Sequence, residues 1–369
     1  MEQHAPSSSP VAGTSPPLLA GVRVLELASV LAGPLAGSAL AERGATVTKV
    51  ERPPDGDVTR AWRSPGEAAD GPSSAYYAAA NWGKEVLFLD LTSPEAAAWL
   101  AQELPRTDVL LHNFKRADLP KLGLDPEALA AHFPRLIQVH LVGFEDAPAR
   151  LAYDVVVQAE TGYMAMNGDP DGLPTRMPVA LMDVMASHQI RAAVLEGLYA
   201  RERGHRGFRA TVSLERSGLS ALVNQATQWL VAGSLPQRLG SQHPQIAPYG
   251  DVLPCSDGHI VLAVGNDRQF AALTSAMGLP HLAADPRFAH NADRVRHRAA
   301  LVSSLAPAAA AHPRSHWDAL FQARGIPAGV VRTLDEVFAP GTPGERHLRL
   351  DPDGTRRPAA VAYDVVISP

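Results

Sequence analysis

Short apolar runs alternate with longer amphipathic segments over about the first 145 residues of the chain. The run GVRVLELA at 21–28 is followed by the small-residue segment GPLAGSALAERG and by a second apolar run, ATVTKVE, at 45–51. Apolar runs of this length predict buried strands, and the segment between them predicts a crossover helix that ends at a glycine. The same pattern continues at 85–91, 108–114 and 135–144. It predicts a parallel sheet with helices on both faces, in a doubly wound, Rossmann-like α/β domain.

The pattern changes near residue 154, where mainly helical segments replace the alternation. A stretch rich in Pro and Gly at 233–250 then predicts a loop or linker. Beyond it, the hairpin-like DVLPCSDGHIVLAVG and the helical patterns that follow predict a smaller α+β domain. We therefore divide the chain into a disordered tail at 1–17, a large α/β domain at 18–215, a linker at 216–245, a small α+β domain at 246–325 and a shortened return to the large domain at 326–369.

Composition and charge exclude several classes of protein. The chain has 369 residues, of which 46% are apolar and 19% charged, and its formal net charge is -5. It lacks the single-sign charge field expected of a protein that binds nucleic acid or an anionic membrane, and no apolar run approaches the about 20 residues of a membrane span. Cys255 is the one cysteine, and the N-terminus lacks a secretory signal. We expect a cytoplasmic protein without disulfides or a thiolate metal cluster.

The first strand–helix–strand unit invites comparison with dinucleotide-binding folds. Glu51 ends the second strand about 20 residues after the first turn, where an acid would bind a ribose hydroxyl. The turn itself reads ASVLAGPLAGS and lacks the G-x-G that lets the backbone approach a pyrophosphate. We therefore expect neither nicotinamide nor flavin, and we assign Gly33 and Gly37 to close packing of the helix against the sheet.

One acid stands out in the segment RMPVALMDVMASHQ, where Asp183 lies among apolar residues at the start of a predicted helix. Two interpretations compete for it. Asp183 is either the N-cap of that helix, where its oxygens would accept the free backbone N–H groups of the first turn, or a nucleophile held in a cleft of low dielectric.

Further segments keep a fixed order along the chain. They are LLAGVRVLELASVLAGPLAGS, NWGKEVLFLDL, DVLLHNFKRADLPKLGL, AYDVVVQAETGYMAMNGDPDGLPTR with VALMDV, and HPQIAPYGDV with GHIVLAVGNDRQF and DPRFAHNADRVRHR. Together they span about 18–340 and resemble the family III CoA-transferases, or CaiB/BaiF family, which include formyl-CoA:oxalate CoA-transferase and α-methylacyl-CoA racemase. The form HPxIxPY resembles the branch that contains succinyl-CoA-dependent dicarboxylate transferases.

The resemblance implies an acyl-CoA:carboxylate CoA-transferase in which Asp183 attacks the thioester of acyl-CoA. The implied intermediates are a mixed acyl anhydride and then an aspartyl-CoA thioester. An aspartate whose pKa is near its ordinary value of about 3.9, or is raised by a unit or two, stays mostly ionised at pH 7, so we expect this attack to need no base. The resemblance also implies CoA esters and a carboxylic acid as substrates, no tightly bound cofactor, and an interlocked homodimer.

Residues that would contact CoA follow from the same resemblance. They are Ser29, Val30 and Leu31 near the pantetheine and thioester, Asn113 and Phe114 beside the adenine, and Arg52 and Lys121 at the nucleotide end. For Arg52 and Lys121 the alternative is solvated surface charge, and for Asn113 and Phe114 it is a strand-end turn and a core aromatic. Lys84 is a weaker candidate for such a contact than these residues, and we favour its assignment to the surface.

Three residues have weaker indications of a role in positioning substrate, namely Tyr153, Asp154 and His243. The racemases of the family place a His before the acid that corresponds to Asp154, and this chain has Tyr153 there, a poor base at pH 7. Racemisation of 2-methylacyl-CoA is therefore the second hypothesis. A catalytically degenerate CoA-binding protein is the third, since Leu31 stands where the transferases often have Gln and GSQHPQIAPYG lacks a run of glycines. The 14 histidines show no metal-ligand spacing, so we expect no metal.

Overall fold

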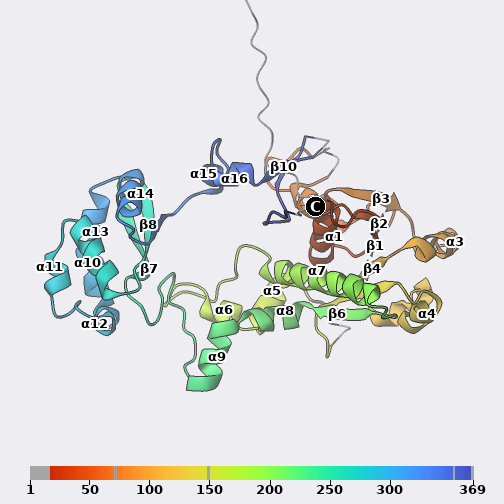
Figure 1. The fold of residues 1–369 in the computed structure, drawn as a ribbon, viewed down its shortest axis with the longest axis horizontal. Coiled ribbons are helices and arrows are strands. Elements are labelled where there is room, and N and C mark those ends of the chain that lie inside the picture. The colour runs from red at the N-terminus through yellow and green to blue at the C-terminus, as the bar shows by residue number, and fades with distance from the viewer. Residues whose placement is uncertain (1–16, 70, 72, 148–149, 352–353, 367–369) are drawn as a thin grey trace, which may run out of the picture. The chain divides into compact units, whose positions relative to one another are not determined.

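The computed structural model describes residues 17–366 except 70, 72, 148–149 and 352–353, and the predicted tail at 1–17 lies almost wholly outside the described residues. The chain forms two compact units. The first contains the described residues of Met1–Tyr163, Arg176–Ser234 and Pro340–Pro369, and the second contains Met164–Thr175 and Leu235–Ala339. Both are drawn in Figure 1.

The first unit is built on a six-stranded sheet in the order β3-β2-β1-β4-β5-β6, with every neighbouring pair parallel. Its strands are β1 (Arg23–Leu27), β2 (Thr46–Glu51), β3 (Lys84–Phe88), β4 (Val109–His112), β5 (Ile137–Val142) and β6 (Arg209–Ser213). The prediction of a parallel α/β sheet is confirmed. Because the chain leaves β1 in one direction along the sheet and resumes beside it at β4, a crevice opens at the carboxyl ends of these two strands.

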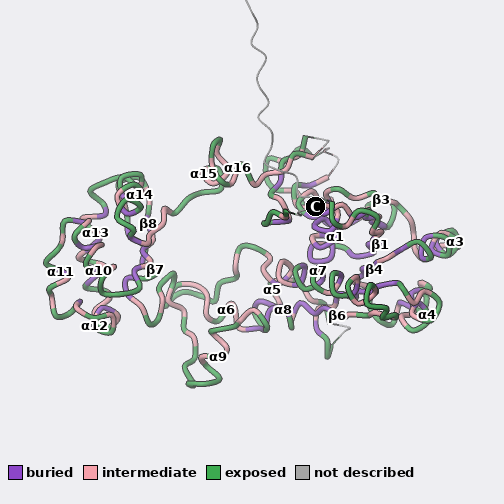
Figure 2. Tube along the Cα trace, in the orientation of Figure 1, coloured by how far each residue is buried: buried purple, intermediate pink, exposed green. Residues whose placement is uncertain are grey.

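Helices cover both faces of this sheet, because successive strand residues point to opposite sides. Val24 belongs to a core cluster with α1 (Ala32–Glu42) and α7 (Leu181–Glu202). Leu25 belongs to a second cluster, with α3 (Pro94–Glu103) and α4 (Pro126–His132). Figure 2 shows the buried residues following the strands and the inner side of α7.

Two glycines let α1 approach the sheet closely. A Cβ on Gly33 would lie 2.5 Å from the Cβ of Ala28, and a Cβ on Gly37 would lie 1.8 Å from Oε2 of Glu26. Any larger residue would push the helix away from β1. The remaining elements of the first unit are α2 (Ala75–Asn81), α5 (Asp154–Glu160), α8 (Leu214–Ala221), α9 (Val223–Ala232), α16 (Pro343–Arg346), β10 (Leu348–Leu350), β11 (Arg356–Pro358) and the short 3-10 helices Val58–Ala61, Leu104–Arg106, Arg116–Asp118 and Pro120–Leu122. The four-residue α6 (Tyr163–Met166) lies where the two units meet in the sequence.

The second unit combines an antiparallel sheet with helices. Its strands are β7 (Tyr249–Cys255), β8 (Gly258–Ala263) and β9 (Ala328–Val330). Its helices are α10 (Asp267–Ala276), α11 (His281–Ala284), α12 (Asn291–Arg296), α13 (Arg298–Ala310), α14 (Arg314–Ala323) and α15 (Leu334–Val337). Phe270, Trp317 and Phe321 fill its own core. In the described part of the chain, no helix is both long and apolar enough to span a membrane.

Candidate active site

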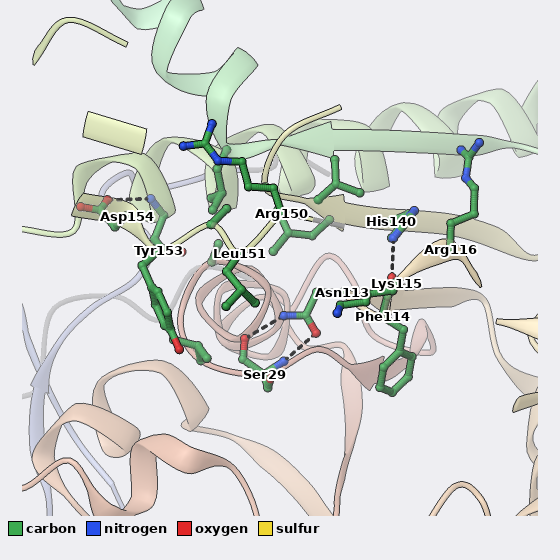
Figure 3. Close-up of a pocket in the computed structure, with 18 residues that line it drawn as sticks. Ser29, Asn113, Phe114, Lys115, Arg116, His140, Arg150, Leu151, Tyr153 and Asp154 are labelled. Atoms are coloured by element: carbon green, nitrogen blue, oxygen red, sulfur yellow. Dashed lines mark hydrogen bonds between the residues drawn. The ribbon is translucent and has the colours of Figure 1, made fainter. Parts of the chain in front are cut away.

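A cleft of about 270 Å³ opens in the first unit at the carboxyl ends of β1, β4 and β5. Its walls come from the turn between β1 and α1, the loop after β4, the segment after β5 and the first turn of α7 (Figure 3). The lining residues are Ser29, Val30, Ala32, Asn113, Phe114, Lys115, Arg116, His140, Leu141, Val142, Gly143, Arg150, Leu151, Ala152, Tyr153, Asp154, Asp183 and Leu214. The cleft therefore contains both acids that the sequence singled out.

Asp183 lies in the first turn of α7, and its half-buried side chain reaches the cleft. Ala32, the first residue of α1, lines the same cleft, and its backbone N–H favours the ionised form of this carboxylate. Burial, and then the nearby charge of Asp154, raise the pKa of Asp183 to about 7, and the Ala32 N–H opposes that rise. The expectation of a mostly ionised acid, with a pKa raised by at most a unit or two, is corrected here, because a pKa of about 7 leaves the protonated form substantially populated at neutral pH.

Asp154 caps the helix on which Asp183 stands. Its Oδ2 accepts the backbone N–H groups of Met182 at 2.6 Å and Asp183 at 3.3 Å, and its Oδ1 accepts from Nε2 of Gln158 at 2.5 Å. The N-cap position of α7 belongs to Ala180, which offers no side-chain acceptor. The interpretation of Asp183 as an N-cap residue is therefore wrong, because Ala180 holds that position and Asp154 accepts the first-turn N–H groups of Met182 and Asp183.

The turn between β1 and α1 contributes the opposite wall of the cleft. Asn113 holds this turn with two hydrogen bonds to the backbone of Ser29, each 3.2 Å long (Figure 3). Val30 has a φ of 73°, a left-handed conformation that is strained for a β-branched residue. Leu31, in contrast, is buried and does not line the cleft.

A second pocket, of about 580 Å³, lies at the carboxyl ends of β1 and β2. Arg52 and Lys121 line it, and Ser29 and Phe114 line both this pocket and the cleft. The two hollows therefore adjoin, and the residues predicted to contact CoA, except Leu31, are distributed along them. Glu51 also lines the pocket, but Arg60 and the hydroxyl of Tyr77 already donate to its carboxylate, so it is not free for a ribose.

The remaining candidates have different surroundings. Tyr153 lines the cleft and is 57% exposed. His243 belongs to the second unit, where its Nδ1 accepts from the backbone N–H of Gln245 at 3.1 Å and its ring packs against Tyr249. Over the described ranges, no group of three His, Cys, Asp or Glu side chains gathers as a metal site would require.

Tyr76 is a further residue near this site that the sequence did not indicate. Burial raises the pKa of its phenol, and the carboxylates of Asp183, Asp154 and Asp57 raise it further. The hydroxyl therefore stays protonated near these acids and remains able to donate a hydrogen bond. No signal in the helical segment AYYAAAN distinguishes this tyrosine from its neighbour, since contact with the acids depends on the tertiary fold.

Comparisons with known proteins show which family the chain belongs to. A family model described as CoA-transferase family III matches residues 19–354. The chain belongs to CoA-transferase family III. It is 39% identical to the succinate–glutarate CoA-transferase of Agrobacterium fabrum, over 92% of this chain and 87% of that one. It is 34% identical to the acetyl-CoA:oxalate CoA-transferase of Acetobacter aceti, again over 92% of this chain and 87% of that one.

Two solved structures have a fold similar to that of this chain. A CaiB/BaiF family protein from Brucella suis is 36% identical, with a TM-score of 0.84 over 94% of this chain and 92% of that one. A hypothetical protein from Mycobacterium tuberculosis is 30% identical, with a TM-score of 0.75 over 89% and 87% of the two chains. This family III chain is therefore an enzyme, an acyl-CoA:carboxylate CoA-transferase, with acyl-CoA and a carboxylic acid as its substrates.

Proposed function

We propose that this family III transferase moves CoA between two carboxylic acids through Asp183, and that at least one of the acids is a dicarboxylic acid. The observation that carries the proposal is the Asp183 carboxylate itself. It reaches a cleft that Ala32 at the start of α1 also lines, and it is not occupied in capping its helix because Asp154 does that. A nucleophile needs this combination of access and freedom.

The reaction is a series of acyl exchanges. An oxygen of Asp183 attacks the thioester carbonyl of the donor, the C–S bond breaks, and CoA leaves as a thiolate from a mixed anhydride. The thiolate then attacks the aspartyl carbonyl of the anhydride, which releases the donor acid as a carboxylate and leaves an aspartyl-CoA thioester. The acceptor carboxylate attacks this thioester, and the expelled thiolate attacks the acceptor carbonyl of the new anhydride. The products are the new CoA ester and the free Asp183 carboxylate, with no net change in protons or oxidation state.

The adjoining hollows support a path for CoA. Arg52 and Lys121 are suited to the phosphates of the nucleotide end, because cations attract phosphate oxygens. The pantetheine arm would then pass Ser29 and Phe114, which line both hollows, and bring its thioester to Asp183. The strand order supports a Rossmann-like description of this unit. In folds of this kind, ligands bind at the carboxyl ends of the strands. CoA enters and leaves as a substrate, without a tightly bound cofactor.

The charge of the cleft supports a dicarboxylic acid. Lys115, Arg116 and Arg150 line it, and within the described residues Lys115 and Arg116 form no salt bridge. A cation of this kind would neutralise a second carboxylate while the first one reacts. The relatives named for succinate, glutarate and oxalate have dicarboxylic acids as their substrates.

The exposed last turn of α9 supports a homodimer, which we propose to be the interlocked form implied by the family resemblance. Trp229, Leu230 and Val231 on this helix are 50%, 72% and 81% exposed. Figure 2 shows α9 as mostly exposed. Adjacent large apolar side chains open to water are typical of a surface that a partner covers. We further propose that the enzyme acts in the cytoplasm, where its single thiol stays reduced.

The proposal is tested by trapping the aspartyl intermediates. The protein is mixed with succinyl-CoA and glutarate, quenched with hydroxylamine or borohydride, and its peptides are mapped by mass. We expect a label on Asp183, and loss of both label and transfer in Asp183→Asn. Transfer at an undiminished rate in that variant would contradict the mechanism. Exchange of the α-proton in deuterated buffer, without a label, would favour racemisation instead.

A further inference from the structure

Four buried charged side chains form a continuous network of ion pairs beneath the β1–α1 turn. Nζ of Lys84 lies 2.8 Å from Oε1 of Glu26, and Nζ of Lys49 lies 3.2 Å from the same oxygen. Lys49 also lies 3.1 Å from Oδ2 of Asp57. Each of these side chains is at most 1% exposed. The charges alternate in sign, so this network of four side chains is neutral as a whole, which is the condition for burying ions.

Lys84, at one end of this network, forms hydrogen bonds to two helices. Nζ of Lys84 donates to the carbonyl of Pro34 in α1 at 2.8 Å and to the carbonyl of Ala80 in α2 at 2.9 Å. Burial lowers the pKa of Lys84 to about 8, even with Glu26 beside it. The assignment of Lys84 to the surface is therefore wrong. Its stem passes into the protein, and Gly37 leaves the room that the Glu26 carboxylate needs.

The other end holds the backbone of the turn itself. Nζ of Lys49 donates to the carbonyl of Ala28 at 2.8 Å, and Oδ2 of Asp57 accepts the N–H of Val30 at 3.1 Å. With the two bonds from Asn113 to Ser29, the turn is fixed by side chains over three successive residues. Val30 is the strained residue of this turn, and such a conformation persists only where its surroundings hold it.

The turn leads directly into α1, whose first residue, Ala32, lines the same cleft as Asp183, and the N–H of Ala32 favours the ionised form of that acid. We propose that Lys49 and Asp57 are positioning residues, which lock the Val30 turn so that the N–H of Ala32 and the wall of the cleft meet the Asp183 carboxylate in the reactive arrangement. Neither side chain touches the nucleophile. This inference rests on the proposed function for the role of Asp183, but the geometry that it concerns is independent of the reaction.

The test replaces the pair without changing net charge. Lys49→Met/Asp57→Asn removes one positive and one negative charge, and the Asn retains an oxygen for the N–H of Thr59, which Asp57 Oδ1 accepts at 3.0 Å. The matched control is Glu42→Gln/Arg357→Met. That pair is also buried, with its charges 3.2 Å apart, and Glu42 also accepts a backbone N–H, that of Ala360. It lies at the far end of α1.

The primary readout is the titration of Asp183, measured by ¹³C NMR on protein labelled at aspartate and assigned with Asp183→Asn. We expect the pKa of Asp183 to rise by about half to one pH unit in Lys49→Met/Asp57→Asn, because the N–H of Ala32 is no longer held toward it. Turnover should fall by about tenfold or more at a nearly unchanged KM for acyl-CoA. The control should show neither change.

The outcomes separate this inference from the proposed function. An unchanged titration together with unchanged turnover would overturn the positioning role. If the titration shifts while Asp183→Asn still transfers CoA, positioning stands and the proposed mechanism fails. Should the double variant not fold, Asp57→Asn alone serves, because Lys49 keeps Glu26 as its partner. Its turnover should fall, and Val30→Gly added to it should restore part of the loss, since glycine adopts this φ without strain. Full turnover in Asp57→Asn would also overturn the inference.

Discussion

Asp154 accepts the backbone N–H groups of the first turn of α7, so that one acid holds the helix on which the other, Asp183, stands. The same proximity raises the pKa of Asp183 after burial has already raised it. Asp154 thus has two effects on the candidate nucleophile, one through the backbone and one through charge. They can be separated by mutation, because an amide keeps the acceptor oxygen and loses the charge.

Asp154→Asn is expected to lower the pKa of Asp183 and leave α7 capped. Removing a like charge favours the ionised form, so the acid side of the kcat profile should move to lower pH by about one unit. Asp154→Ala should in addition lose about 1 kcal/mol of stability with the cap. The matched control is Glu202→Gln, at the exposed end of the same helix. Rate profiles between pH 5 and 9 check the shift, and an unmoved profile in Asp154→Asn would contradict it.

The raised pKa of Asp183 also means that this residue lowers the free energy of unfolding above neutral pH. Its folded-state pKa is about 7 against an ordinary value of 3.8, so between these values the native protein binds a proton that the unfolded chain has released. Stability from this group therefore falls as the pH rises through that window. Asp183→Asn is expected to be more stable than the natural protein by about 1–3 kcal/mol at pH 8, with the difference fading toward pH 4. Urea unfolding at both pH values measures this, and equal stability at pH 8 would refute it.

The parallel sheet follows from local patterning, because a strand buried on both faces is mainly apolar, and RVLEL and VLLH are mainly apolar apart from Arg23, Glu26 and His112. Asp183 was singled out because a charge among apolar residues is expensive unless it has a partner or a task. Choosing between the N-cap and the nucleophile interpretations of Asp183 required the structure. The residue that caps α7 is Asp154, which is 28 positions from Met182 in the sequence, and no local pattern encodes that contact.

The support beneath the turn was equally hidden from the sequence. Lys49 and Lys84 sit in strands whose neighbours are charged or polar, TVTKVE and KEVLF, and such patterns normally indicate exposed side chains. Their burial depends on Glu26, which lies on β1 and reaches them across the sheet. The left-handed Val30 runs against its own propensity. Tertiary contacts override local preference at these residues, as is common where a site is built.

Arg52 and Lys121 are expected to hold the nucleotide end of CoA. Changing either residue to Met should weaken CoA binding by about tenfold, because a phosphate group of CoA then loses a charged partner. The loss should shrink as salt is raised, since these side chains are exposed and their fields are screened. Calorimetric titration with CoA at two salt concentrations measures it. Arg206→Met, which removes an exposed cation in the turn after α7, is the control and should bind normally. Normal affinity in both test variants would place the nucleotide elsewhere.

The exposed apolar residues in the last turn of α9 are expected to hold two copies of the chain together. Trp229→Glu/Leu230→Glu places two charges on side chains that are 50% and 72% exposed in the single chain, so folding of the chain itself should be little affected. Within an interface the same charges would be desolvated without partners, and the dimer should dissociate. Leu334→Glu, at a residue that is 74% exposed on α15, is the matched control and should leave the dimer intact. Sedimentation velocity at micromolar concentration distinguishes the two masses. A natural protein that sediments as a monomer would contradict the dimer, and a charged α9 variant that remains a dimer would show that this helix lies outside the interface.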